Sequence, residues 1–270
     1  MVDLVNLEAE EKFFEQVLKT HVGKLAVDQQ GTHIIQKVIT SFTEANRQFV
    51  FDEIKEDFLS VSKTSHGLCV IKKLVANTTF QVNRDSMVEF ISQNAIELIQ
   101  DPYGNYAVQE IMEKWKGQNF TSLYNKVKGK IAQLSIQKFS SNVVEKCLEM
   151  SDPEQRADII RHIAKIDKLV SVMRNSFGNY VVQKALFLAD DETKKILADS
   201  IYENIPIIQD KKIKVKWAQL LQSSIESYPS LLGKYDLEKY LIEVQIQRNT
   251  RSPNELEYMR NVNDFDEDDG

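Results

Sequence analysis

Three short segments of the chain carry side chains that could bind one planar polar ligand together. In each set, position i holds an amide or a hydroxyl, position i+1 holds a flat side chain, and position i+4 holds an amide or a carboxylate. The three sets are Asn105, Tyr106 and Gln109; Ser141, Asn142 and Glu145; and Asn179, Tyr180 and Gln183. Because residues i and i+4 lie one above the other on a helix, both can hydrogen bond to one ligand edge while residue i+1 stacks beside it.

Each of these triplets follows a small residue, and the small residues recur at a nearly constant interval. They are Gly31, Gly67, Gly104, Ser140 and Gly178, separated by 36, 37, 36 and 38 residues. At the triplet positions, the first two segments hold Thr32, His33 and Gln36, and Leu68, Cys69 and Lys72. A period of this length is typical of a solenoid, in which each unit packs on its neighbours.

Apolar residues in every repeat predict two helices joined by a short turn. After the small residue come two apolar pairs, as in Ile34–Ile35 with Val38–Ile39 and in Val143–Val144 with Cys147–Leu148. Spacings of three and four residues place these pairs on one stripe of a helix, so Cys147 is predicted to be a buried core thiol. Apolar residues six and nine positions before the small residue predict a preceding helix, and the link to the next repeat is expected to be helical too.

The predicted fold is all-α: residues 1–248 form one curved α-solenoid, an armadillo-like superhelix of repeats of about 36 residues. The helices that carry the triplets are called the triplet helices below. They are expected near residues 31–39, 67–75, 104–112, 140–148 and 178–186. A helical cap is expected over 187–248, with one helix at 212–227 and another at 236–247. Residues 249–270 are polar and end in an acidic cluster, which predicts a disordered tail.

The charge of the chain limits how it could bind a nucleic acid. The formal net charge of the 270 residues is −6, but five acidic residues lie within the last seven, so the remainder carries about −1. A body without positive charge must obtain much of its affinity for a nucleic acid from stacking and base-edge hydrogen bonds. The 2 cysteines lie in unrelated segments, and the sequence lacks a secretory signal and an apolar run of membrane-span length. These features predict a soluble cytoplasmic protein.

No residue pattern in the sequence indicates an enzyme. The four histidines, His21, His33, His66 and His162, fall in different repeats without the spacing of metal ligands. The chain also lacks a glycine-rich phosphate loop and a nucleophile motif. We therefore expect neither a cofactor nor a metal, and no small-molecule substrate.

The three clearest triplets strongly resemble the RNA-reading helices of the Pumilio (PUF) family, over about residues 10–205. In that family three side chains of one helix meet one base, and the RNA runs antiparallel to the protein. The resemblance implies that the triplet starting at Asn179 reads U, the triplet starting at Ser141 reads G, and the triplet starting at Asn105 reads U. The implied ligand is single-stranded RNA with a 5′-UGU core.

The chemistry of the bases agrees with this assignment. Uracil presents an acceptor, a donor and an acceptor, which the amides of Asn and Gln can match. Guanine presents two adjacent donors, N1–H and N2–H, and the carboxylate of Glu145 can accept both. Tyr106, Tyr180 and His33 could stack on bases, a contact worth about 1–3 kcal/mol per base. Asn142 could stack through its amide plane.

The first two repeats depart from the family pattern. The triplet starting at Thr32 resembles the family's Asn-His-x-x-Gln reader of U, with Thr in place of Asn. Leu68, Cys69 and Lys72 replace a Cys-Arg-x-x-Gln reader of A, so the preference for the fourth base stays open. A full family array has eight repeats and five are evident here, which predicts a site near five nucleotides. Whether the chain is a piece of a longer array is also open.

The resemblance implies that the protein binds 3′ untranslated regions of messenger RNAs, represses their translation and stability, and contacts deadenylase subunits. Two alternatives remain. One is an α-solenoid scaffold for protein interactions, whose polar triplets are merely solvated. The other is a PUF-like protein that binds structured RNA in ribosome biogenesis. Lys37, Lys146 and Lys184 each follow position i+4 and face either solvent or a phosphate.

Overall fold

The computed structural model describes residues 2–241, and these residues form α-helices, one short 3-10 helix and no strand. Five repeats follow one another, and each has a short helix, a triplet helix and a third helix. They comprise α2 (Val22–Val27), α3 (Gly31–Ser41) and α4 (Gln48–Glu56); α5 (Phe58–Ser62), α6 (Ser65–Asn77) and α7 (Gln81–Gln93); α8 (Ala95–Ile99), α9 (Gly104–Lys114) and α10 (Thr121–Lys128); α11 (Ile131–Ser135), α12 (Ser140–Met150) and α13 (Pro153–Ala164); and α14 (Leu169–Arg174), α15 (Gly178–Leu188) and α16 (Asp191–Asn204). Helix α1 (Val2–Leu18) precedes them, and η1 (Ile205–Ile207) and α17 (Lys211–Ile225) follow.

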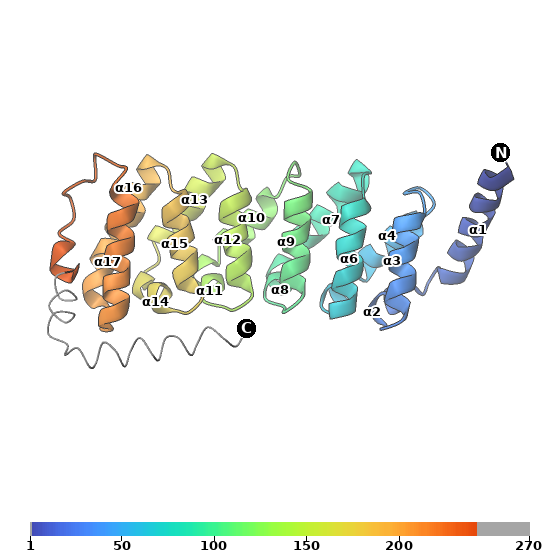
Figure 1. The fold of residues 1–270 in the computed structure, drawn as a ribbon, viewed down its shortest axis with the longest axis horizontal. Helices are drawn as coiled ribbons and strands as arrows, with labels where there is room; N and C mark the ends of the chain where they lie inside the picture. Colours follow the sequence, from blue (N-terminus) through green and yellow to red (C-terminus); the bar gives the residue numbers. More distant parts are fainter. Residues whose placement is uncertain (1, 242–270) are drawn as a thin grey trace, which may run out of the picture.

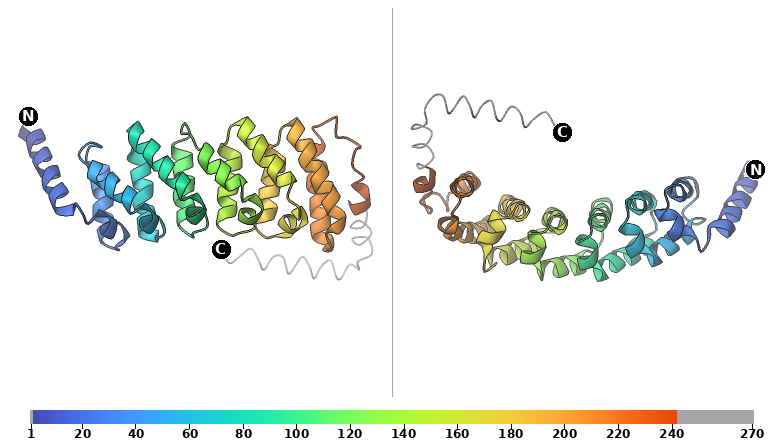
Figure 2. Two further views of the ribbon diagram at one scale, coloured as in Figure 1. Left: turned by 180° about the vertical axis from the view of Figure 1, so that it is seen from behind. Right: turned by 90° about the horizontal axis from the view of Figure 1, so that it is seen from below.

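The triplet helices lie side by side in chain order, from α3 to α15, and α17 continues the row (Figure 1). The third helices, from α4 to α16, form a second row behind them. Seen from below, the array is curved, and the triplet helices lie along its concave side (Figure 2). The all-α solenoid predicted from the period of the small residues is therefore confirmed.

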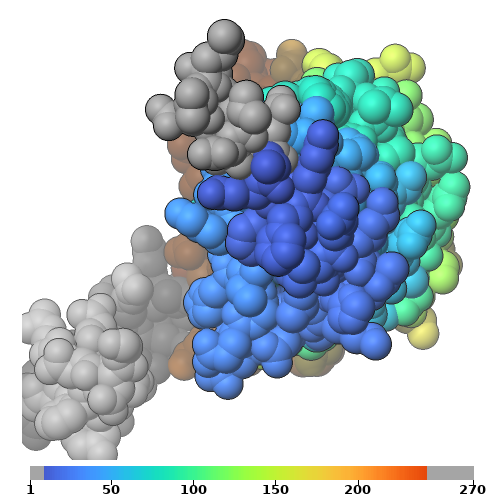
Figure 3. All heavy atoms as spheres, turned by 90° about the vertical axis from the view of Figure 1, so that its right-hand side faces the viewer, coloured from blue at the N-terminus to red at the C-terminus, as the bar shows by residue number. Residues whose placement is uncertain are grey.

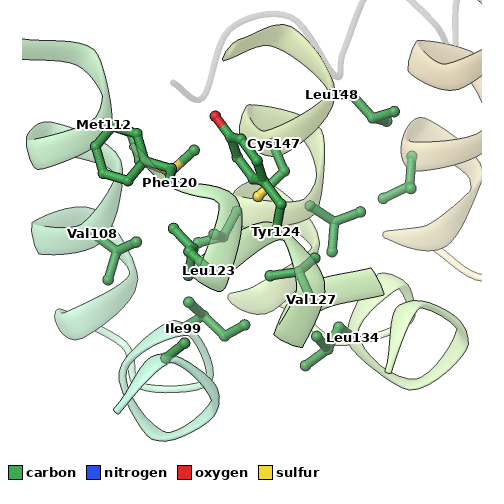
Figure 4. Close-up of a cluster of buried hydrophobic side chains, with 14 of the residues drawn as sticks. Ile99, Val108, Met112, Phe120, Leu123, Tyr124, Val127, Leu134, Cys147 and Leu148 are labelled. Carbon is green, nitrogen blue, oxygen red and sulfur yellow. The ribbon is translucent and has the colours of Figure 1, made fainter. Parts of the chain in front are cut away.

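One continuous apolar core runs through the whole array, from Leu18 to Leu237. Between the third and fourth repeats it includes Leu123, Tyr124 and Cys147, which lie between the two rows of helices (Figure 4). Cys147 is fully buried, as its position on the apolar stripe predicts, and this burial raises the pKa of its thiol to about 12. The thiol is therefore an unreactive core group.

In four of the repeats, a side-chain oxygen three residues before the glycine accepts a hydrogen bond at the start of the triplet helix. The backbone N–H of that glycine donates to it, and the acceptors are Asp28, Thr64, Asp101 and Asn175, at 2.7–3.0 Å. Such a cap satisfies a backbone donor that the helix leaves free. The glycine is needed because the chain turns tightly: a Cβ atom on Gly67 would lie 2.0 Å from the carbonyl oxygen of Val61.

Basic residues in the third helices, or directly before them, cap the C-terminal ends of the triplet helices. Arg156 Nε donates to Leu148 O at 2.8 Å, and Lys194 Nζ donates to Leu186 O at 2.6 Å. Arg47 makes the corresponding contact with Ile39 O in the first repeat. These contacts satisfy carbonyls that the helix end leaves free. Burial lowers the pKa of both Arg47 and Lys194.

The N-terminal end of the array contains one error of the sequence prediction. Ile34 was expected in the core with Ile35, yet 45% of its surface is exposed. In the later repeats the residue at this position is buried, but α3 is the first triplet helix and no other triplet helix precedes it. Figure 3 looks at this end, where α1 also leaves Phe13 and Val17 exposed.

The C-terminal predictions fare differently. The helix expected at 212–227 is confirmed as α17, which packs on α15 and α16. Of the helix expected at 236–247, residues 238–241 are helical and residues 242–247 lie outside the described residues; the acidic tail at 249–270 lies wholly outside them. Within residues 2–241, no helix combines the length and apolarity that crossing a membrane requires.

Candidate nucleic-acid interface

The five triplets form a row along the concave side because every triplet occupies the same place in its helix. The small residue is the first residue of the triplet helix in four repeats and the third residue of α6 in the second repeat. Positions i, i+1 and i+4 therefore fall within the first eight residues of every triplet helix. Since neighbouring triplet helices pack against each other, successive triplets are also neighbours in space. The described residues contain no group of His, Cys, Asp or Glu side chains that could hold a metal ion.

Within a triplet, the side chains at positions i and i+4 contact each other. Gln109 Nε2 donates to Asn105 Oδ1 at 3.0 Å, and Gln183 Nε2 donates to Asn179 Oδ1 at 2.7 Å. The corresponding contact in the first repeat joins Gln36 Nε2 to the hydroxyl of Thr32 at 3.1 Å. The expected proximity of these positions is therefore observed in three repeats.

The asparagine of each amide pair is held more firmly than the glutamine. Asn105 Nδ2 donates to the carbonyls of Asp101 and Pro102, at 2.9 and 3.0 Å, and its side chain is fully buried. Asn179 Nδ2 donates to two backbone carbonyls of the preceding turn in the same way. The glutamine at position i+4 is only half-buried. We infer that the asparagine fixes the orientation of the glutamine, whose amide is the more accessible group.

Position i+1 presents its side chain to solvent in most repeats. Tyr106 is 47% exposed and Tyr180 is 56% exposed. His33 and Cys69 are also exposed, and Asn142 is half-buried. Exposed tyrosines between successive i+4 positions are arranged as a stacking surface for flat ligands.

The fourth triplet places an acid where its neighbours place amides. Ser141 is buried and Glu145 is half-buried. Burial raises the pKa of Glu145, and the positive charge of Lys184 only partly opposes this effect. Among the described residues, no side chain or backbone group donates a hydrogen bond to the Glu145 carboxylate. The fourth triplet therefore offers an acceptor whose hydrogen bonds are unmade, which favours a ligand with donors.

The second triplet differs in chemistry from the others. Leu68 is half-buried against the core, and Cys69 is exposed. Lys72 Nζ lies 3.8 Å from Glu110 Oε2 on α9, the next triplet helix. The lysine is therefore directed along the row toward the third repeat, and this triplet lacks the paired amides of its neighbours.

Two lysines that follow position i+4 form ion pairs with acids on the triplet helices. Lys146 Nζ lies 2.6 Å from Glu113 Oε1 and 3.0 Å from Glu149 Oε2. Lys184 also pairs with Glu149. We call these four residues the acid–lysine ladder. The ion pairs of the ladder neutralise the charges of Lys146 and Lys184, two of the lysines that could have contacted phosphates.

One lysine of α17 contacts the last triplet, and the sequence analysis did not identify it. Lys216 Nζ donates to Asn179 Oδ1 at 3.1 Å and lies 5.5 Å from the centre of the Tyr180 ring. A signal was present, because Lys216 follows Tyr180 by 36 residues, which is one repeat period. The residue before position i in α17 is Lys214 and not a small residue, so the pattern of small residues does not extend to this helix.

Comparison with known proteins gives consistent matches. A family model described as the Pumilio-family RNA binding repeat matches residues 21–55, 94–128, 130–164 and 168–202. The second repeat, with its unusual triplet, lies outside these segments. A Pumilio domain-containing protein of Schizosaccharomyces pombe is 33% identical over 210 residues, covering 78% of this chain and 31% of the relative. Pumilio homolog 12 of Arabidopsis thaliana is 30% identical over 223 residues, covering 83% of this chain and 37% of the relative.

Solved structures give the same result for the fold. The RNA-binding domain of yeast Puf5p bound to SMX2 RNA is 26% identical, with a TM-score of 0.69, covering 80% of this chain and 68% of that one. PUF-8 in complex with PBE-RNA is 21% identical, with a TM-score of 0.69, covering 81% and 65%. The chain spans roughly a third of the length of the curated relatives.

The fold and its concave row of triplets define a helical-repeat protein that presents hydrogen-bonding and stacking groups at regular intervals. Four repeats match the family model, and a relative more than 30% identical covers most of the chain. The chain belongs to the Pumilio (PUF) family of RNA-binding repeat proteins. Membership of a family of RNA-binding repeats supports a non-enzymatic role.

Proposed function

We propose that this protein binds single-stranded RNA containing 5′-UGU, with one base for each of the last three triplets. In this proposal α15 meets the first U, α12 meets G and α9 meets the second U. The RNA then runs antiparallel to the chain. The observation that carries the proposal is the half-buried Glu145 carboxylate, which lies in the row between two amide pairs and has no described hydrogen-bond donor.

The chemistry of Glu145 distinguishes guanine from the other bases. Guanine can donate from N1–H and N2–H to the two carboxylate oxygens at once. Uracil and cytosine would place a carbonyl oxygen near the carboxylate, and adenine offers its donor beside a ring-nitrogen acceptor. A base that covers this half-buried acid without donating to it removes water from the carboxylate at a cost in free energy, so such bases are disfavoured. Gln109 and Gln183 offer both a donor and an acceptor, which suits uracil.

The i+1 positions support a stacked arrangement of these bases. Tyr106 and Tyr180 are exposed on either side of Asn142 in the row. A base that meets Glu145 therefore has flat groups available on both sides. Stacking contributes about 1–3 kcal/mol per base. This contribution matters here because the acid–lysine ladder pairs two of the lysines near the triplets with glutamates instead of leaving them to the phosphates.

The proposed cellular role is control of messenger RNAs in the cytoplasm, through sites in 3′ untranslated regions, with repression of translation and of mRNA stability. One solved structure of similar fold is the Puf3 RNA-binding domain bound to a Cox17 RNA 3′ UTR recognition sequence. Recruitment of deadenylase subunits is part of the proposal.

Binding to short RNAs tests the core of the proposal. Fluorescence polarisation would compare an RNA beginning UGU with the same RNA beginning UCU, at one stated salt concentration. We expect the second RNA to bind at least about tenfold more weakly, which corresponds to about 1.4 kcal/mol. Equal binding of both RNAs would refute base reading at the fourth triplet. Absence of binding to both would favour a scaffold role, and preference for a folded RNA would favour the ribosome-biogenesis alternative.

A further inference from the structure

Helix α17 continues the register of the triplets beyond the last base assigned above. The i+1 residues of the five triplets are separated by 36, 37, 36 and 38 residues, and Lys216 follows Tyr180 by 36. Val215 and Gln219 then occupy positions i and i+4 of α17, which packs beside α15. Val215 is buried and cannot hydrogen bond through its side chain. Helix α17 therefore lacks the paired groups that read a base, and it places a cation at the stacking position.

The ammonium group of Lys216 occupies the outer side of the last triplet. It donates to Asn179 Oδ1 at 3.1 Å and lies 5.5 Å from the centre of the Tyr180 ring. A base that stacks on this side of the ring must displace the ammonium group. The four-carbon stem of a lysine is flexible, so the charge can swing outward while the stem stays against the base.

Lys216 also differs in its electrostatic surroundings from three lysines that lie within or directly after the second, fourth and fifth triplets. Lys72, Lys146 and Lys184 each pair with a glutamate of a triplet helix. Within residues 2–241, Lys216 has no acidic side chain within ion-pair distance, and its side chain is exposed. Its charge is therefore available to an anionic group of a ligand, whereas the charges of the ladder are not.

We propose that Lys216 binds the RNA phosphodiester that precedes the first uridine of the UGU core. The inference rests on the proposed function, in which the triplet of Asn179 and Gln183 meets that uridine. When the base enters, it takes the place of the ammonium group, and the ammonium group moves to the phosphate on the 5′ side. Because the side chain of Val215 cannot hydrogen bond to a base, this contact does not depend on the identity of the base before the first uridine. The RNA-binding row therefore ends in a charge contact. This contact favours a UGU site that lies inside a longer RNA, because an RNA that starts at the first uridine lacks the phosphodiester.

Two RNAs separate this contact from base reading. Both carry UGUAU and a fluorophore at the 3′ end; one begins with a 5′-hydroxyl uridine, and the other has an abasic ribose joined to that uridine by a phosphodiester. We expect the wild-type protein to bind the abasic-extended RNA roughly two- to fivefold more tightly, the range of an exposed charge pair. This preference should shrink as salt is added, because the contact is screened.

Three variants identify the cation. Lys216→Met should bind both RNAs with equal affinity, and Lys216→Arg should retain the preference for the extended RNA. Lys211→Met is the matched control: it removes one charge from the same helix, about 140° around the axis from Lys216. Lys211→Met should retain the preference for the abasic-extended RNA. Thermal melting checks that each variant is folded, and Lys216→Gln replaces the Met variant if that variant unfolds.

The outcomes are distinct from those of the proposed function. Equal binding of the two RNAs by the wild-type protein overturns the proposal, and so does a preference that survives in Lys216→Met and Lys216→Gln. The same RNAs with UCU in place of UGU are measured in parallel. A wild-type protein that fails to distinguish UGU from UCU contradicts the base-reading function itself, whatever the effect of the 5′ phosphate.

Discussion

Exchange of the fourth triplet should change the base that the protein prefers at the second position of its site. The change is Ser141→Asn, Asn142→Tyr and Glu145→Gln, which copies the triplets of the repeats on either side. In those repeats the glutamine donates to the asparagine at 2.7–3.0 Å, and the asparagine donates to backbone carbonyls of its own turn. The same backbone turn is present in α12, so the new amide pair should adopt the same arrangement. We expect a preference for UUU over UGU.

The size of the change follows from the hydrogen bonds of Glu145. In the wild-type protein guanine supplies two donors to a half-buried carboxylate, whereas uracil supplies one donor and brings a carbonyl oxygen beside the negative charge. A mismatch of this kind costs about 1–3 kcal/mol, or roughly 5- to 150-fold in affinity. The triple variant should lose this preference for G and gain one for U of similar size.

The assay is competition between labelled UGU and unlabelled UUU RNA, measured by fluorescence polarisation for both proteins. Glu145→Gln alone is the control, because it removes the carboxylate while it keeps Asn142 at the stacking position. The single change should weaken the preference for G without a full switch to U. If the triple variant still preferred UGU, the assignment of α12 to the second base would be wrong.

Three further experiments test the remaining features. Glu149→Gln should release Lys184, whereas Lys146 keeps its ion pair with Glu113, and it should steepen the salt dependence of RNA binding by about 0.7 in log–log slope if Lys184 then reaches a phosphate; an unchanged slope would show that it does not. Gly67→Ala should lower the unfolding free energy by about 1–3 kcal/mol, since its Cβ atom would collide with a carbonyl oxygen of α5, whereas Gly117→Ala, with open space around it, should change it by less than about 1 kcal/mol, both measured by urea denaturation. A thiol reagent should label exposed Cys69 in the folded protein and reach Cys147, with its pKa of about 12, only on unfolding; rapid labelling of both would contradict the buried position of Cys147.

The repeats could be predicted from the sequence because the same packing requirements apply to each of the five triplet helices. Each triplet helix must begin close to a backbone carbonyl of the helix before it, which requires a small residue such as Gly67 or Ser140. Each must also bury one apolar stripe against its neighbours. These two requirements leave a periodic signal in the chain, and the triplets stand at fixed positions within it.

Other features depend on contacts that carry no such signal. In the sequence, a basic residue such as Arg156 cannot be distinguished from an ordinary surface charge. The structure shows that it caps the C-terminal end of α12, in the row of triplet helices. Lys146 and Lys184 could not be assigned to solvent or phosphate, because the glutamates that pair with them lie on other turns and other helices. The exposure of Ile34 depends on its place at the end of the array, which the local pattern does not record.

Each triplet helix packs on the next in a similar way, and this similarity affects how the number of repeats can change in evolution. Because every unit begins with the same turn and offers the same two faces to its neighbours, a recombination event can duplicate or delete a whole unit and still leave matching contacts at the new junction. In the proposed function, in which each triplet meets one base, the RNA site would then lengthen or shorten by one nucleotide, while a point mutation in a triplet would change the preference at one base. Under that proposal, the length and the base sequence of the RNA site can change through separate genetic events.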